Sequence, residues 1–236
     1  VLLLVTAAAV WFLSPSPDRK PGRGRATKDL YAPLKYARVW RFSLYYVVVF
    51  GAYVALAGWL PKYYVDVYGL TPANAGYLTA LFIFPASLLR PLGGWLSDKF
   101  GPRIVTYAVF VGMTAALGVL SALPVGVAAF TALVFVVGVG MGVGKASVYK
   151  YVPNYFPMDV GAVGGLVGML GALGGFVLPP AFGAVGRAPG TPQTAFFALP
   201  ALTVASLVWL HVTVMRLKAA ERRAEELETA TVAVGV

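Results

Sequence analysis

The stretch from Asn74 to Arg103 reads NAGYLTALFIFPASLLRPLGGWLSDKFGPR, and the interpretation of the whole chain starts from it. It begins as an apolar helix long enough to cross a bilayer and ends in a glycine-rich, charged hairpin. Arg90 stands inside the helix, eight residues before Asp98. At a rise of about 1.5 Å per residue it lies about 12 Å from the polar edge, near the midplane of a hydrocarbon core of about 30 Å. A guanidinium at that depth is costly, so we expect it to face a water-filled cavity, a partner or a substrate.

The composition of the rest of the chain also indicates a membrane protein. Of the 236 residues, 59% are hydrophobic and 12% are charged, whereas a soluble domain is about 25% charged. Apolar runs close to twenty residues long recur, which predicts a polytopic helical membrane protein. Six runs fall approximately at 42–61, 73–97, 104–123, 125–148, 160–182 and 196–215.

These runs divide the chain into four parts. Residues 1–13 form an apolar run that is short for a span and has neither a basic segment before it nor a clear cleavage site, so we interpret it as the end of a truncated helix. Residues 14–41 are a basic linker rich in Pro and Gly. Residues 42–217 hold the six spans, and residues 218–236 form a charged tail, which we expect to be a short solvated helix or disordered.

The basic residues predict the orientation in the membrane. The formal net charge is +10, and the Lys and Arg residues fall mainly between the apolar runs, as in membrane topology rather than nucleic-acid binding. If the linker is cytoplasmic and the runs alternate, fifteen of the 19 basic residues are inside and two, Lys62 and Arg187, are outside. This excess predicts a multi-pass protein of the cell membrane with a cytoplasmic linker and tail.

The sequence lacks the residues that several classes of function require. The chain has no cysteine, so no disulfide, thiolate nucleophile or cysteine metal site is available. No nucleophile–base pair, metal cluster or cofactor fingerprint occurs, and we therefore expect no enzyme, metal or cofactor. The only histidine, His211, is expected to be a packing or interface residue.

The charges inside the predicted spans are positive. All nine Asp and Glu residues fall in linkers, loops, helix ends or the tail, whereas Arg90 lies within a span and Lys145 is expected to. A cation carrier needs a carboxylate at depth, so an anion is favoured, and the arginine fork matches an oxyanion with two coplanar oxygens. Alternatively, Arg90 pairs with a carboxylate or with carbonyls of helices outside this chain. Lys145 and Lys150 either mark the positive end of a helix or stabilise an anion that leaves toward the cytoplasm.

Aromatic and small residues form stripes on the predicted helices. Tyr46, Phe50 and Tyr53 share one face of the 42–61 helix. We expect Tyr53 to pack, while Tyr46 and Phe50 either pack or line a polar cavity. Two small-xxx-small pairs predict tight helix packing: Gly138 with Gly142, and Gly140 with Gly144.

The 160–182 helix is the richest in glycine. One face carries Gly164, Gly168, Gly171 and Gly175. This face serves either helix packing or the approach of backbone to a small ligand. Pro179 and Pro180 are expected to end or kink the helix.

The hairpin resembles a motif of the major facilitator superfamily, G-x-x-x-D-x-x-G-x-R. Its four positions are Gly94, Asp98, Gly101 and Arg103. In that superfamily the hairpin is cytoplasmic, follows helices two and eight, and takes part in conformational change. The basic linker before it and the four spans after it make this copy similar to the one after helix eight. The resemblance implies an all-α membrane fold, namely the end of helix 6 and the C-terminal six-helix bundle, helices 7–12.

A narrower resemblance is to the nitrate/nitrite porter (NarK-type) family. GKASVYKYVPNYFP followed by GAVGGLVGMLGALGGFVLPPAFG is similar to the end of its helix ten and the nitrate signature of its helix eleven. Arg90 matches the family's substrate arginine, Tyr46 its substrate tyrosine, and Phe50 the aromatic residue that packs against the anion. The resemblance also implies that three glycines approach the substrate: Gly164, Gly168 and Gly171.

Two lysines bear on this resemblance. Lys150 matches a lysine in the F-K-x-x-P pattern of many proton-coupled members, with Tyr149 in place of Phe. Those members commonly carry G-N-G where this chain has Gly144, Lys145 and Ala146. The extra cation bears on substrate preference or coupling.

The resemblance implies transmembrane transport of nitrate or nitrite by alternating access, with two halves that rock about a midplane site. The partners implied are the anion, protons if the carrier is a symporter, a missing N-terminal six-helix half and the lipid bilayer. Symport and exchange both stay open. Two alternatives are a carrier for another small anion, such as a monocarboxylate, and a non-transporting membrane sensor or remnant module.

Overall fold

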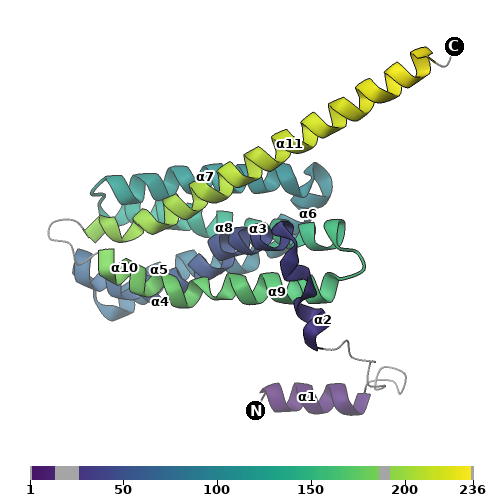
Figure 1. Ribbon diagram of the computed structural model, residues 1–236. Coiled ribbons are helices and arrows are strands. Elements are labelled where there is room, and N and C mark those ends of the chain that lie inside the picture. The colour runs from purple at the N-terminus through teal and green to yellow at the C-terminus, as the bar shows by residue number, and fades with distance from the viewer. Residues whose placement is uncertain (1, 14–26, 186–191, 235–236) are drawn as a thin grey trace.

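The computed structural model describes residues 2–13, 27–185 and 192–234, and these residues form helices and no strand (Figure 1). The α-helices are α1 (Leu2–Leu13), α2 (Thr27–Tyr31), α3 (Ala37–Tyr46), α4 (Ala52–Tyr68), α5 (Pro72–Leu88), α6 (Arg90–Phe100), α7 (Pro102–Ala122), α8 (Val127–Tyr155), α9 (Val160–Ala172), α10 (Gly174–Val185) and α11 (Ala198–Val234). Two 3₁₀ segments, η2 (Ala32–Lys35) and η4 (Pro192–Phe197), and one π-helical segment, η3 (Val47–Gly51), join them.

The described helices form six segments that are long and apolar enough to cross a membrane, one of them a bent pair. In chain order they are Ala37–Tyr68, the pair Pro72–Leu88 and Arg90–Phe100, Pro102–Ala122, Val127–Tyr155, Val160–Gly183 and Pro192–Glu226. The prediction of an all-α membrane fold is confirmed. In Figure 1 these helices form one bundle, and α1 lies apart from it.

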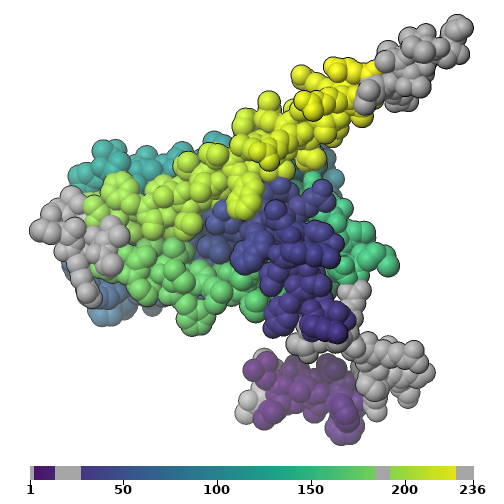
Figure 2. All heavy atoms as spheres, in the orientation of Figure 1, coloured from purple at the N-terminus to yellow at the C-terminus, as the bar shows by residue number. Residues whose placement is uncertain are grey.

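The first and the last of the six segments extend furthest beyond their apolar runs. The first begins at Ala37, five residues before the expected start, and continues through Pro61 to Tyr68. It stops at Gly69, whose φ of 66° is the left-handed conformation typical of a helix C-terminus. The last helix, α11, runs on through the charged tail to Val234. Figure 2 shows its C-terminal part extending beyond the bundle.

The prediction of one continuous helix around Arg90 is wrong. The structure has two helices, α5 and α6, with a bend of 43° between them. Pro91 has no backbone N–H, and its ring clashes with the carbonyl one turn earlier, so a proline inside an apolar run favours such a break. Arg90 therefore begins α6 instead of lying in the middle of a straight helix.

The glycine-rich segment is interrupted as well, but not at its prolines. The break lies at Leu173, and Pro179 and Pro180 are inside α10. At the break, Gly174 meets the π-helical segment η3 so closely that an added Cβ would lie 3.0 Å from the Cα of Gly51. The interruption thus lies beside a backbone-to-backbone contact that a residue larger than glycine would not allow.

Glycines also let α8 pack into the centre of the bundle. A Cβ added at Gly138 would lie 2.7 Å from the Phe82 carbonyl oxygen, and one at Gly142 would overlap the Pro85 carbonyl oxygen, both on α5. On the other side, a Cβ at Gly144 would lie 2.7 Å from the Val49 side chain. The small-xxx-small pairs therefore act in helix packing, as predicted.

Candidate functional site

Arg90 and Tyr46 meet at the surface of a pocket. The Nη2 of Arg90, at the start of α6, donates a hydrogen bond to the Oη of Tyr46, at the end of α3, over 2.9 Å. Tyr46 is buried, whereas Arg90 is exposed in this chain. The pocket has a volume of about 420 Å³ and is lined by Tyr46, Arg90, Lys145, Ala146 and Tyr149. Three separate helices thus contribute polar side chains to one cavity.

Aromatic rings hold Tyr46 in place. The ring of Phe50 stacks on that of Tyr46 with centroids 5.1 Å apart, and the ring of Tyr149 meets it edge-on at 4.7 Å. Phe50 itself is not among the residues that line the pocket. In this conformation it supports the pocket through Tyr46.

The glycine face of α9 packs against the same tyrosines. A Cβ at Gly171 would overlap the ring of Tyr46, and one at Gly168 would lie 2.6 Å from the Tyr149 hydroxyl. That hydroxyl donates a hydrogen bond of 3.0 Å to the carbonyl of Gly164. The three predicted glycines therefore lie behind the tyrosines of the pocket, and at Gly168 and Gly171 the approach is too close for a larger residue.

Lys145 is the pocket residue whose role the sequence left open. It lies inside α8, is 3% exposed, and donates a hydrogen bond of 2.9 Å to the carbonyl of Ala86. Its Nζ also lies 3.3 Å from the centroid of the Tyr53 ring. The lysine in place of the common asparagine was the only signal in the sequence for this position. The groups that the ammonium contacts become clear only from the packing of α8 against the end of α5.

Lys150 lies elsewhere. Its ammonium forms an ion pair with Asp98 of the hairpin, and it does not line the Arg90 pocket. Arg103, on the other arm of the hairpin, donates a hydrogen bond of 2.9 Å to the hydroxyl of Tyr155. Both charged positions of the hairpin motif thus contact the end of α8 in this conformation.

The two glycines of the hairpin differ. Gly101 has φ 82° and precedes α7, so the turn requires a residue that adopts a positive φ. Gly94 has no atom within 4 Å of an added Cβ. Within the described residues, the surface beside Gly94 is open.

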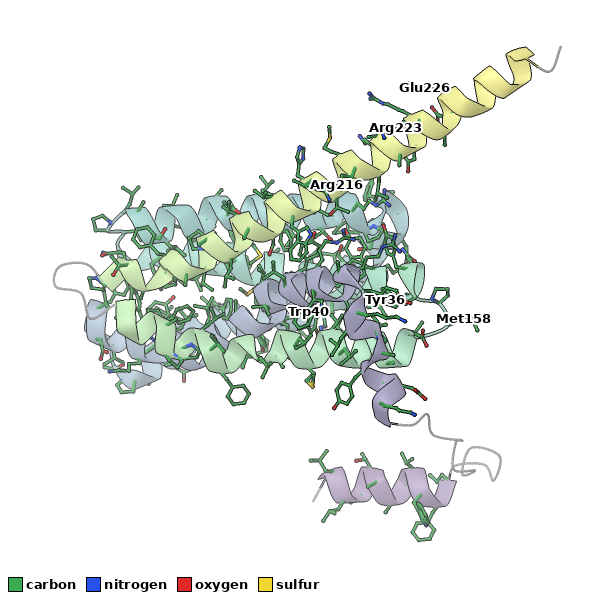
Figure 3. The ribbon with its side chains drawn as sticks, in the orientation of Figure 1. Tyr36, Trp40, Met158, Arg216, Arg223 and Glu226 are labelled. Carbon is green, nitrogen blue, oxygen red and sulfur yellow. The ribbon has the colours of Figure 1, made fainter. Side chains whose placement is uncertain are left out.

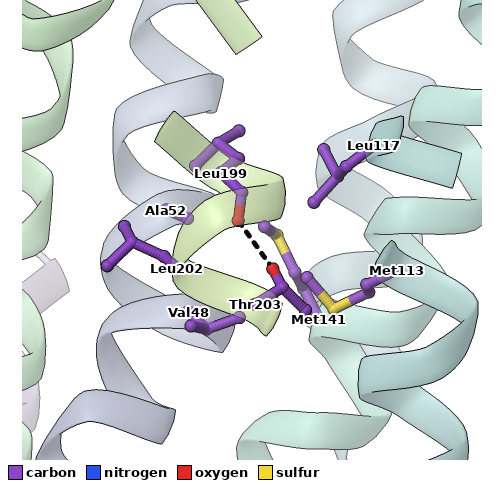
Figure 4. Close-up of a pocket in the computed structure, with 8 residues that line it drawn as sticks. All are labelled: Val48, Ala52, Met113, Leu117, Met141, Leu199, Leu202 and Thr203. Atoms are coloured by element: carbon purple, nitrogen blue, oxygen red, sulfur yellow. Dashed lines mark hydrogen bonds between the residues drawn. The ribbon is translucent and has the colours of Figure 1, made fainter. Parts of the chain in front are cut away.

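A second cavity differs from the Arg90 pocket because its lining is almost entirely apolar. Figure 4 shows eight residues around a gap between the first, third, fourth and sixth spans, among them Met113, Met141 and Leu199. The gap leaves no room for a water molecule. Its one polar side chain, Thr203, donates to the Leu199 carbonyl of its own helix over 2.8 Å. It is a packing defect with no group to orient an anion.

His211 lies on α11 away from both cavities. Its Nδ1 is 3.2 Å from the hydroxyl of Tyr107 on α7. This contact joins two helices, as expected for a packing or interface residue. Among the described residues, no three His, Asp or Glu side chains are grouped so that they could hold a metal ion.

Comparison with known proteins gives several relatives with related names. The chain is 55% identical over 235 residues to the "Probable nitrate/nitrite antiporter NarK1" of Thermus thermophilus, covering 92% of this chain and 53% of the relative. It is 38% identical to the "Nitrite extrusion protein" of Bacillus subtilis, over 89% of this chain and 54% of the relative. It is 31% identical to the "Probable nitrate transporter NarT" of Staphylococcus epidermidis, over 88% and 53%.

The chain spans about half the length of these relatives. The model of one protein family, described as the Major Facilitator Superfamily, matches residues 65–234. That match covers most of the chain, including the hairpin and the last five spans. The chain therefore belongs to the major facilitator superfamily.

Proposed function

We propose that this chain is the C-terminal half of a carrier that moves nitrate or nitrite across a membrane by alternating access. The observation that carries the proposal is the pocket in which Arg90 and Tyr46 meet without an acidic side chain. The names of the relatives support the substrate class. An N-terminal six-helix half would form the other wall of the pocket, since Arg90 is exposed in this chain.

The chemistry of the pocket suits a planar oxyanion. A guanidinium has five N–H donors, and one of them is used on Tyr46. The Tyr46 oxygen accepts that bond, and its own O–H, which in this conformation is shared with the hydroxyl of Tyr149, would turn to donate to an anion. Arg90 and Tyr46 would therefore hold two oxygens of nitrate from adjacent sides, and Phe50 would keep the tyrosine ring in position.

The remaining predicted residues would act in the conformational change around this site. The face formed by Gly164, Gly168 and Gly171 would allow α9 to slide past the tyrosines when the two halves rock. The contacts of the hairpin with α8 would open and close in the same cycle. Lys150, engaged by Asp98 in this conformation, would meet the anion as it leaves toward the cytoplasm.

We further propose that the linker and the tail are cytoplasmic, in a cell membrane. The excess of Lys and Arg in both supports this orientation. Figure 3 shows Tyr36 near the end of the bundle from which α11 emerges, Trp40 beside α3, and Arg216 and Arg223 along the emerging part of α11. Aromatic and basic side chains together are typical of a membrane–water interface.

The test is uptake of labelled nitrate by the full-length parent in liposomes, wild type against Arg90→Lys. Lysine keeps the charge but removes the bidentate fork. We expect saturable uptake by the wild type and a loss of about a hundredfold in the variant, since a charged donor pair contributes about 3 kcal/mol. An inward proton gradient that stimulates uptake would indicate symport, and stimulation by internal nitrite would indicate exchange.

Two outcomes would contradict the proposal. Wild-type rates in Arg90→Lys would remove Arg90 from anion recognition. Uptake that a small monocarboxylate inhibits at lower concentration than nitrate or nitrite does would assign another anion to the same pocket. The chain by itself, with one wall of the pathway, is expected to give no saturable nitrate flux in liposomes.

A further inference from the structure

Lys145 has bonding capacity that its protein partners leave unused. An ammonium group has three N–H donors. The Ala86 carbonyl takes one of them, at 2.9 Å, and the Tyr53 ring covers one face of the charge, with its centroid at 3.3 Å. Lys145 also lines the pocket of Arg90. One donor is therefore left for an occupant of that pocket.

The position of Lys145 depends on the break between α5 and α6. Ala86 is among the last four residues of α5, whose carbonyls have no partner within the helix. Gly142 lies one turn before Lys145, and its missing side chain lets α8 approach the Pro85 carbonyl. The end of α5, which carries partial negative charge, thus fixes the ammonium at the wall of the pocket.

The two cations of the pocket have neutral partners. Arg90 donates to the hydroxyl of Tyr46, and Lys145 to a carbonyl. The other titratable groups beside Lys145 are the phenols of Tyr53 and Tyr149. Among the residues that the structure describes, no carboxylate lines the pocket. Two like charges that line one pocket repel each other, and an anion between them would be attracted by both.

We propose that Lys145 is a second anion-binding cation, so that this half of the carrier alone supplies two positive charges to the bound oxyanion. This rests on the proposed function and adds a specificity-determining residue to it. Arg90 supplies the planar fork, and Lys145 supplies a point charge from the opposite helix. The pair would raise the affinity for a small monovalent anion above that of a site with asparagine at position 145.

The experiment compares nitrate uptake kinetics of the full-length parent in liposomes for wild type, Lys145→Met and Lys145→Gln. Methionine keeps an unbranched apolar stem against Tyr53, and glutamine keeps a neutral donor for the Ala86 carbonyl. We expect KM to rise about tenfold in both variants, with Vmax within about twofold, because each loses a charge-assisted contact to the anion. Lys62→Met is the matched control, since Lys62 is exposed and pairs with Asp66.

The two kinetic constants separate binding from a merely structural role. If Lys145 only secured the end of α5, its loss would lower Vmax through less folded protein and leave KM unchanged, and that result would overturn the proposal. A wild-type KM in Lys145→Gln would overturn it too, even if Lys145→Met did not fold. If the wild type transports nitrate and Arg90→Lys reduces uptake, but the Lys145 variants keep the wild-type KM, the inference fails and the proposed function stands.

Discussion

The Arg90 pocket and the closed gap of Figure 4 are two cavities of one bundle that differ in the polarity of their linings and in the space they leave. The gap is enclosed by methyl groups and thioethers, and its single hydroxyl is satisfied within its own helix. The pocket is open, and its two cations have neutral partners that leave N–H donors free. A bundle in lipid tolerates an empty apolar gap, whereas a pocket with uncompensated charge implies an occupant.

This comparison makes opposite predictions for stability and transport. Substitutions around the gap should change the free energy of unfolding and leave the KM for nitrate unchanged. Substitutions in the pocket wall should do the reverse, and residues that only support the wall should change both. Three variants test this, from the largest expected effect to the smallest.

Met141→Ala enlarges the closed gap. Met141 is fully buried there, so the lost contacts should lower the free energy of unfolding by about 2–5 kcal/mol, with KM for nitrate unchanged. Unfolding in mixed detergent and uptake by the folded protein measure the two effects. Met215→Ala, at a half-exposed position of α11, is the control and should change neither. A raised KM in Met141→Ala would mean that the gap communicates with the pocket.

Gly171→Ala tests the support behind the pocket. Its Cβ would overlap the ring of Tyr46, and Tyr46 or α9 must then shift. We expect a loss of about 1–3 kcal/mol in stability and a raised KM, because Tyr46 would leave its position beside Arg90. Gly161→Ala on the same helix has open space around the added methyl and should resemble the wild type. Equal behaviour of the two variants would show that α9 does not position Tyr46.

Tyr46→Phe removes one hydroxyl from the wall. The ring stack with Phe50 would remain, so stability should change little, while KM should rise about fivefold for the loss of about 1 kcal/mol of hydrogen bonding. The neighbouring Tyr45 gives the control, since its buried hydroxyl has no hydrogen-bond partner within the described residues. Tyr45→Phe should leave KM unchanged. An unchanged KM in Tyr46→Phe would show that the Tyr46 hydroxyl contacts Arg90 but does not bind the anion.

Much of the fold could be predicted because bilayer thickness fixes the length of apolar runs. The six spans, the hairpin and the positive interior are readable in the sequence. The break at Arg90 was missed, although Pro91 was its local signal. The break at Leu173 had no comparable signal. It lies beside the approach of Gly174 to Gly51, a contact between segments more than a hundred residues apart, which the local sequence does not reveal.

The same division applies to the site. The sequence by itself predicted that Arg90 lies deep in an apolar run and that every Asp and Glu lies outside such runs, since residue type and position suffice for that prediction. Only the tertiary structure decided which groups surround it. It brought Tyr46 to Arg90, turned Lys150 toward Asp98, and placed Lys145 on the freed carbonyl of Ala86. The partners of these side chains depend on the angle between α5 and α6 and on how closely α8 approaches them. Neither is determined by the sequence of one helix alone.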